Sequence, residues 1–68
     1  MPKLIIGFTD GKEIGYEGED AINLLEALTI AEQQEYVMTP SVALSNGYTL
    51  HLALDNITRI AFKEEESK

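Results

Sequence analysis

The chain of 68 residues contains no cysteine and no tryptophan, and His51 is its only histidine. Without cysteine there is no disulfide framework and no zinc site built on thiolates, which suits a cytoplasmic setting. One histidine with scattered carboxylates does not make a metal site or an activated nucleophile, so we interpret His51 as an ordinary strand residue. The glycines match neither a dinucleotide-binding nor a phosphate-binding signature. We therefore expect no enzymatic activity, no metal and no cofactor.

Cations are scarce and unevenly placed. The chain has 5 Lys and Arg against 12 Asp and Glu, a net charge of -7, and no Lys or Arg lies between Lys12 and Arg59. Phosphates and anionic lipids are bound by basic surfaces, so the charge disfavours direct binding to nucleic acid or to a membrane. It permits a basic protein partner, although solubility alone is the more economical explanation of the acidity.

Long apolar runs are absent as well. No stretch approaches the roughly 20 apolar residues of a membrane-spanning helix, and residues 4–6 are too few for a signal peptide. The sequence predicts a single domain over residues 1–63, followed by an acidic disordered tail over residues 64–68. A hydrophobic content of 44% supports a core, but a domain of this size is only marginally stable by itself.

Two segments show the alternation of apolar and polar residues that is typical of hairpins. Three-residue turns at 9–11 and 45–47 keep the apolar residues of each hairpin on one face, whereas two-residue turns would set them opposite polar residues. The glycine ending each turn suits the left-handed conformation that such a turn requires. The predicted opposite pairs are Ile6 with Ile14 in the first hairpin and Val42 with Leu50 in the second.

Between the hairpins the period changes to that of an amphipathic helix, from Glu19 to about Gln34. Its apolar stripe consists of Ala21, Leu24, Leu25, Leu28 and Ala31. Ile22 and Ile30 fall outside this stripe. The following segment contains Pro40, which has no N–H to donate, so we expect a bulge there or an edge strand.

A third reversal at 55–57 would place Leu52 opposite Ile60 and Leu50 opposite Phe62. The resulting prediction is an α+β fold of order β-β-α-β-β-β, in which one helix covers one face of a curled antiparallel sheet of about five strands. The predicted core face of this sheet carries Leu4, Ile6, Phe8, Ile14, Tyr16, Val42, Leu44, Leu50, Leu52, Ile60 and Phe62.

The opposite face of the predicted sheet is small and poor in charge. A flat face of this kind on a marginal domain favours self-association, so we expect a protein partner and a homo-oligomer. The predicted interface residues are Ile5, Ala43, Thr49, His51, Ala53 and Ala61.

Three functions are compatible with this pattern. The first is a non-catalytic, protein-binding or self-assembling module. The second is an acidic mimic of nucleic acid that inhibits an enzyme with a basic groove; the acidic residues proposed for it are Glu13, Glu17, Glu26 and Glu32. The third is a small-ligand binder at a subunit interface. In size and charge the chain resembles small accessory proteins of bacteriophages and mobile elements, and no motif carries that resemblance further.

Overall fold

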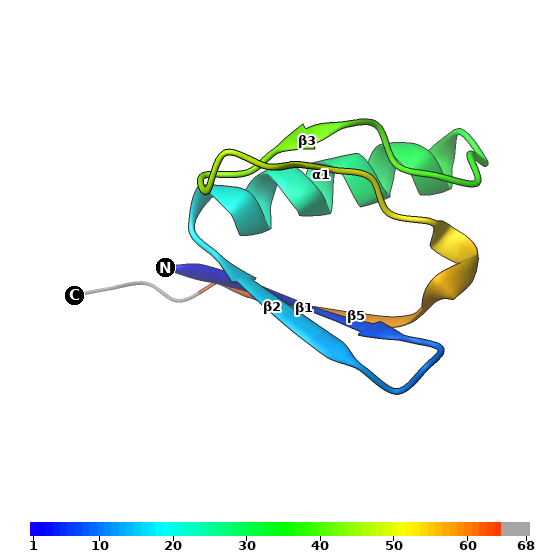
Figure 1. The fold of residues 1–68 in the computed structure, drawn as a ribbon, viewed down its shortest axis with the longest axis horizontal. Coiled ribbons are helices and arrows are strands. Elements are labelled where there is room, and N and C mark those ends of the chain that lie inside the picture. Colours follow the sequence, from blue (N-terminus) through cyan, green and yellow to red (C-terminus); the bar gives the residue numbers. More distant parts are fainter. Residues whose placement is uncertain (65–68) are drawn as a thin grey trace.

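The structure, a computed structural model, describes residues 1–64 as an α+β fold with one α-helix and five antiparallel strands in the predicted order (Figure 1). One layer contains α1 and the β3–β4 hairpin, and the other is the sheet of β1, β2 and β5. Glu64, assigned to the tail by the sequence, is the last residue of β5, and the rest of the predicted tail lies outside the described residues. The elements are β1 (Pro2–Phe8), β2 (Glu13–Glu17), α1 (Glu19–Gln33), β3 (Val42–Ala43), β4 (Thr49–Leu50), the 3-10 turn η1 (Leu54–Asn56) and β5 (Ile57–Glu64).

Both predicted hairpin registers are confirmed within the strands, where Ile6 lies opposite Ile14 and Val42 lies opposite Leu50, but the second register also predicts Met38 opposite Leu54, and this pair is wrong because Met38 bridges to Ala53. The two turns share one chemistry. The terminal glycines at positions 11 and 47 have φ angles of 88° and 93°, which a residue with a Cβ rarely adopts. In each turn the preceding Asp or Asn side chain accepts a hydrogen bond of 3.0 Å from the backbone N–H two residues later.

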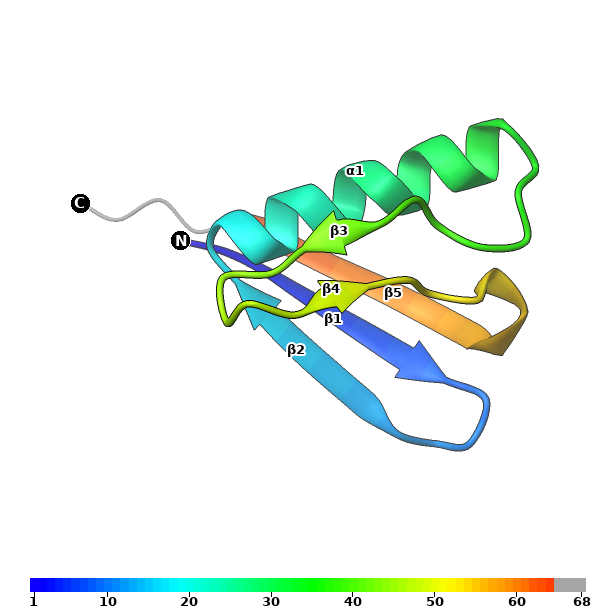
Figure 2. The same ribbon diagram turned by 45° about the horizontal axis from the view of Figure 1, so that its top comes forward.

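The prediction of one curled sheet is wrong. The strands form a three-stranded sheet of order β2-β1-β5 and a separate two-stranded β3–β4 sheet (Figure 2). β5 pairs with β1 and not with β4, so Ile60 lies opposite Ile6 and Phe62 lies opposite Leu4. The predicted pairs of Leu52 with Ile60 and Leu50 with Phe62 are therefore wrong.

The reason is that an apolar period of two chooses a face but not a partner. Ile60 and Phe62 keep their side chains on the helix side equally well beside β1. The turn η1 carries the chain to that strand, and the Thr9 N–H donates to the Asn56 carbonyl at 2.8 Å. β1 offers seven residues for pairing whereas β4 has two, so the pairing with β1 gives the longer ladder.

The segment before β3 is irregular around Pro40, as the proline predicts. Met38 forms an isolated bridge with Ala53, one residue out of step with the β3–β4 register. The buried Thr39 hydroxyl accepts a hydrogen bond of 2.9 Å from the Leu52 N–H. A side chain thus completes the backbone bonding that Pro40 interrupts.

The core lies between α1 and the strands. The predicted helix boundaries and stripe are confirmed except that Leu25 is only half-buried. Leu4, Ile6 and Leu24 are fully enclosed, and each such side chain contributes about 1.5–3 kcal/mol of transfer free energy. The buried apolar residues are Leu4, Ile6, Ala21, Leu24, Ala27, Leu28, Ala31, Val42 and Leu52.

Three residues that the sequence places in the core are substantially exposed. Ile14, Ile60 and Phe62 retain 45%, 41% and 37% of their accessible surface. Each of them is opposite a buried residue of the central strand β1, so all three face the helix side of the sheet. They belong to the two outer strands, however, and not to the central one. One helix and a short hairpin cover the middle of the sheet better than its flanks.

The hairpin turn is attached to the start of the helix by a charged contact. The Asp20 carboxylate accepts hydrogen bonds from the Ser45 N–H at 3.0 Å and from the Ser45 hydroxyl at 2.8 Å. Bonds to a charged acceptor are stronger than neutral ones, and an anion in the first helical turn also complements the helix dipole. This contact fixes the β3–β4 hairpin against the amino-terminal end of α1.

The helix ends in an unusual way. The Tyr36 N–H donates to the Ala31 carbonyl at 2.8 Å, and Glu35 between them has a φ of 58°. This is the position at which glycine is preferred, because a Cβ is strained in the left-handed conformation. Glu35 also places a negative charge at the negative end of the helix dipole.

We therefore expect Glu35→Gly to stabilise the fold by about 0.5–1 kcal/mol. The measurement is the free energy of unfolding in urea. The matched control is Glu26→Gly, which exchanges the same residue types on the exposed helix surface and should cost about 1 kcal/mol. A loss of stability at both positions would contradict the account of the helix end.

Stability should also fall at high pH through Tyr16. Burial, and to a smaller extent the nearby Asp20 carboxylate, raises the pKa of Tyr16. The folded state therefore holds the phenolic proton of Tyr16 to a higher pH than the unfolded state does. This difference stabilises the fold fully below about pH 10. The stabilisation is lost as the pH rises through the folded-state pKa of Tyr16. Urea unfolding between about pH 9 and about pH 11 should show a decline that Tyr16→Phe reduces. Asp20→Asn should reduce it less, and equal declines in wild type and Tyr16→Phe would contradict the assignment.

Candidate functional site

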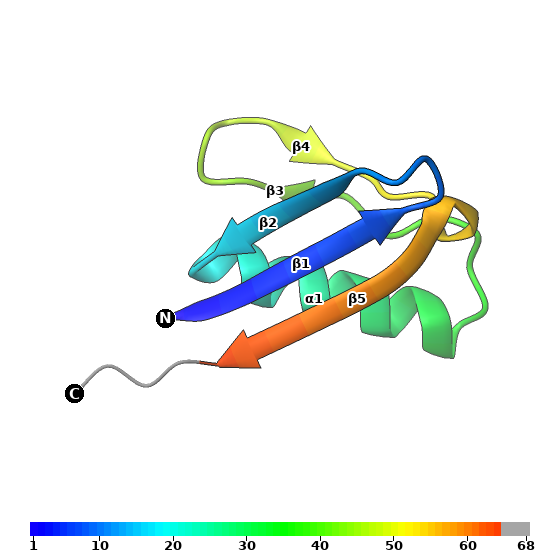
Figure 3. The ribbon, with the colours of Figure 1, turned by 90° about the horizontal axis from the view of Figure 1, so that it is seen from below.

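The two outer strands of the three-stranded sheet, β2 and β5, each leave one edge open within residues 1–64. Figure 3 shows β1 between β2 and β5, and within residues 1–64 no strand pairs with the far side of either. The Phe8 N–H donates to the Lys12 carbonyl at 2.9 Å, so the even-numbered residues of β1 bond towards β2. On β5 the same alternation directs the backbone N–H and C=O groups of Ile60 and Phe62 towards the open edge, in the plane of the sheet. On β2 it directs those of Gly15 outward.

The outer face of the sheet, the side away from α1, carries opposite charges on its two edges. Register places Glu13 and Glu17 on β2, Lys3 on β1, and Arg59 and Lys63 on β5. The remaining outer-face residues of the three strands are Ile5, Gly7, Gly15 and Ala61.

Arg59 reaches across the central strand to form an ion pair with Glu13. Gly7 lies between them, and a Cβ at that position would come within 2.8 Å of the Arg59 Cγ. The absence of a side chain at Gly7 therefore makes room for the arginine. The pair is well exposed, so it contributes at most about 1 kcal/mol to stability, but it fixes where the charges lie.

On the helix side, the same two edges are apolar. Ile14 on β2 and both Ile60 and Phe62 on β5 are partly exposed, as described above. Ile22 of α1 is 44% exposed. Each edge therefore combines unpaired backbone groups with uncovered apolar side chains, which is the usual composition of a site for strand addition.

The residues predicted to form one interface lie in two places. Ile5 and Ala61 are opposite each other on the outer face of the three-stranded sheet, and Ala43 and Thr49 are opposite each other in the β3–β4 hairpin. His51 follows β4, and Ala53 bridges to the segment before β3. Because the sheet is not continuous, these groups do not share one flat surface.

The four predicted acidic residues are also divided. Glu13 and Glu17 lie on the outer face of the sheet, whereas Glu26 and Glu32 are exposed on α1 in the other layer. Among residues 1–64 the cations are Lys3, Lys12, Arg59 and Lys63, and none belongs to the layer of α1 and the hairpin. Within residues 1–64 the Lys and Arg side chains are therefore confined to the sheet layer, whereas acidic residues occur in both layers.

His51 makes two contacts that the sequence analysis did not predict. Its Nε2 lies 3.0 Å from the Ser41 hydroxyl, and its Nδ1 lies 3.4 Å from the Thr39 carbonyl. The hairpin register contained the signal, because continuing it from Val42 and Leu50 by one residue sets Ser41 opposite His51. The contacts join two segments that lack regular strand pairing.

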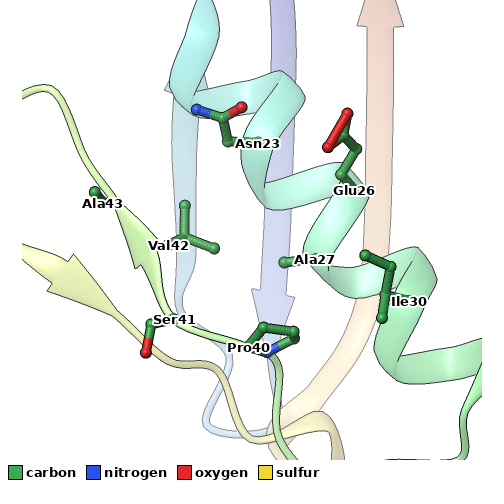
Figure 4. A pocket seen from close by; sticks show the side chains of 8 residues that line it. All are labelled: Asn23, Glu26, Ala27, Ile30, Pro40, Ser41, Val42 and Ala43. Atoms are coloured by element: carbon green, nitrogen blue, oxygen red, sulfur yellow. The ribbon is translucent and has the colours of Figure 1, made fainter.

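A hollow of about 300 Å³ lies beside this pair, between α1 and the segment leading into β3. Figure 4 shows Asn23, Glu26 and Ile30 on its helix wall, while the Ser41 hydroxyl points away from α1. Ser41 is one of the residues that line this hollow, and its hydroxyl is turned towards His51. Within residues 1–64 there is also no group of three or more potential metal ligands, and α1 is too short and too polar to span a bilayer.

Comparisons with protein-family models, with curated proteins and with solved structures found no match to this chain.

Proposed function

We propose that this protein is a non-catalytic, protein-binding module that acts by adding a strand to the open edge of its sheet. The observation that carries the proposal is the edge of β5, a strand of eight residues that pairs with β1 on one side and with no strand of residues 1–64 on the other. Its outward backbone groups include those of Ile60 and Phe62, whose side chains are partly uncovered. Backbone hydrogen bonds would supply affinity, and the apolar side chains would add buried area.

Phe62 is the expected anchor of such binding, because aromatic residues at the centre of an interface dominate its energy. We expect Phe62→Thr, which keeps the strand propensity, to weaken binding by about 2 kcal/mol, or roughly thirtyfold. The matched control is Tyr48→Thr, since Tyr48 is 73% exposed on the other hairpin.

The experiment is affinity capture from the source lysate with the wild-type protein, followed by binding measurements with the identified protein and both variants. Hydrogen exchange should slow at the Ile60 and Phe62 amides in the complex. Equal binding by wild type and Phe62→Thr, with no protection at these amides, would contradict the proposal.

A second candidate function is supported by the segregation of charge. An acidic layer without cations suits an inhibitor that occupies the basic groove of a nucleic-acid enzyme, with steered association that salt suppresses. The two halves of the acidic set can be tested separately. Glu26→Gln with Glu32→Gln should slow association with such an enzyme several-fold at low salt, while Glu13→Gln with Glu17→Gln should have little effect. Equal effects of the two double variants would argue against the helix layer as the inhibitory surface.

A further inference from the structure

We propose that the strand captured by β5 is β2 of a second copy of this chain, so that copies join head to tail into one extended sheet. The inference rests on the proposed function, because it names the partner of the same open edge. It follows from the direction, the charge and the apolar residues of the two edges.

The directions of the two edge strands are compatible with such a junction. β2 and β5 are each antiparallel to β1, so they run parallel to each other. A second copy with its helix on the same side of the sheet therefore presents its β2 parallel to β5 of the first. The outward backbone groups of Gly15 then fall between those of Ile60 and Phe62, which is the alternation a parallel ladder requires. Gly15 is exposed and has no side chain to obstruct the approach.

Charge selects the same arrangement. The registers with β1 place Glu13 and Arg59 in one row of the sheet, and Glu17 and Lys63 in another. Carrying these rows across the junction sets Arg59 of one copy, which also forms an ion pair with Glu13 of its own chain, beside Glu13 of the next. It also sets Lys63 beside Glu17, so both outer-face contacts join opposite charges.

The apolar residues agree with this register. On the helix side the same rows bring Ile60 beside Ile14 of the next copy, and Phe62 beside Tyr16. Three of these four side chains are the partly exposed ones that the helix fails to cover. The junction would remove them from water and so contribute the hydrophobic part of the association.

Pairing of like edges is disfavoured by the same charges. Two β5 edges would bring Arg59 and Lys63 of both copies to one junction, while Glu13, the intrachain partner of Arg59, lies across β1 and not at that junction. Two β2 edges would likewise bring together four glutamates. Like charges across adjacent strands are destabilising, so the unlike edges are the favoured partners. Such a junction is heterologous, and its repetition gives a ring or a filament.

The test is a reversal of charge on one edge at a time. Light-scattering mass should show the wild type above one chain as its concentration rises towards millimolar. Glu13→Lys with Glu17→Lys makes both edges basic, and Arg59→Glu with Lys63→Glu makes both edges acidic. Each double variant alone should remain a single chain with an unchanged circular dichroism spectrum. An equal mixture of the two should recover the mass of the assembly, because each junction again joins unlike edges.

The quadruple variant provides a further check, since it exchanges the two edges and should assemble by itself. A wild type that stays a single chain at all concentrations overturns the inference, and so does assembly of either double variant alone. If the wild type stays a single chain but binds another protein, and Phe62→Thr weakens that binding, the proposed strand-binding function still stands. The two failures are therefore distinguishable.

Discussion

α1 packs across the central strand β1, and this apolar contact positions the other elements of the fold. Leu4 and Ile6 of β1 and Leu24 of α1 are fully enclosed, so the two elements hold each other in place. β1 also provides both ladders of its sheet, and every strand position in that layer is defined relative to it. In a domain without disulfides, this buried apolar contact contributes much of the small net stability.

The open edges follow from the same arrangement. A helix centred on β1 covers the middle of three strands and leaves Ile14, Ile60 and Phe62 partly in water. Larger sheets protect such edges with bulges, prolines or extra elements. Here β5 has a register irregularity only at its beginning, opposite the step from Gly7 to Phe8, and its later residues remain available for pairing. Because one helix covers only the middle of the three strands, the apolar edges on which the proposed function rests stay open.

The charged residues follow two patterns, one between the two layers and one within the three-stranded sheet. Between the layers, the cations belong to the sheet and its turn, while α1 carries only anions. Within the sheet, Arg59 lies across Gly7 towards Glu13 and joins the basic edge to the acidic one. The first pattern suits a basic partner and the second suits another copy. Both use residues that contribute little to stability, which leaves them free to serve recognition.

Local residue patterns are enough to predict both hairpin registers within the strands, the helix and most of its buried stripe, the irregularity at Pro40, and the α+β class. Each of these depends on residues close together in the chain, where period, turn chemistry and propensity agree. The pairing of β5 with β1 does not follow from these patterns, because Ile60 and Phe62 satisfy the same apolar period beside either β1 or β4. That choice divided the predicted interface between two sheets and separated Glu13 and Glu17 from Glu26 and Glu32. It also placed opposite charges on the two open edges, since which strand becomes an edge is a property of the whole sheet and not of any segment.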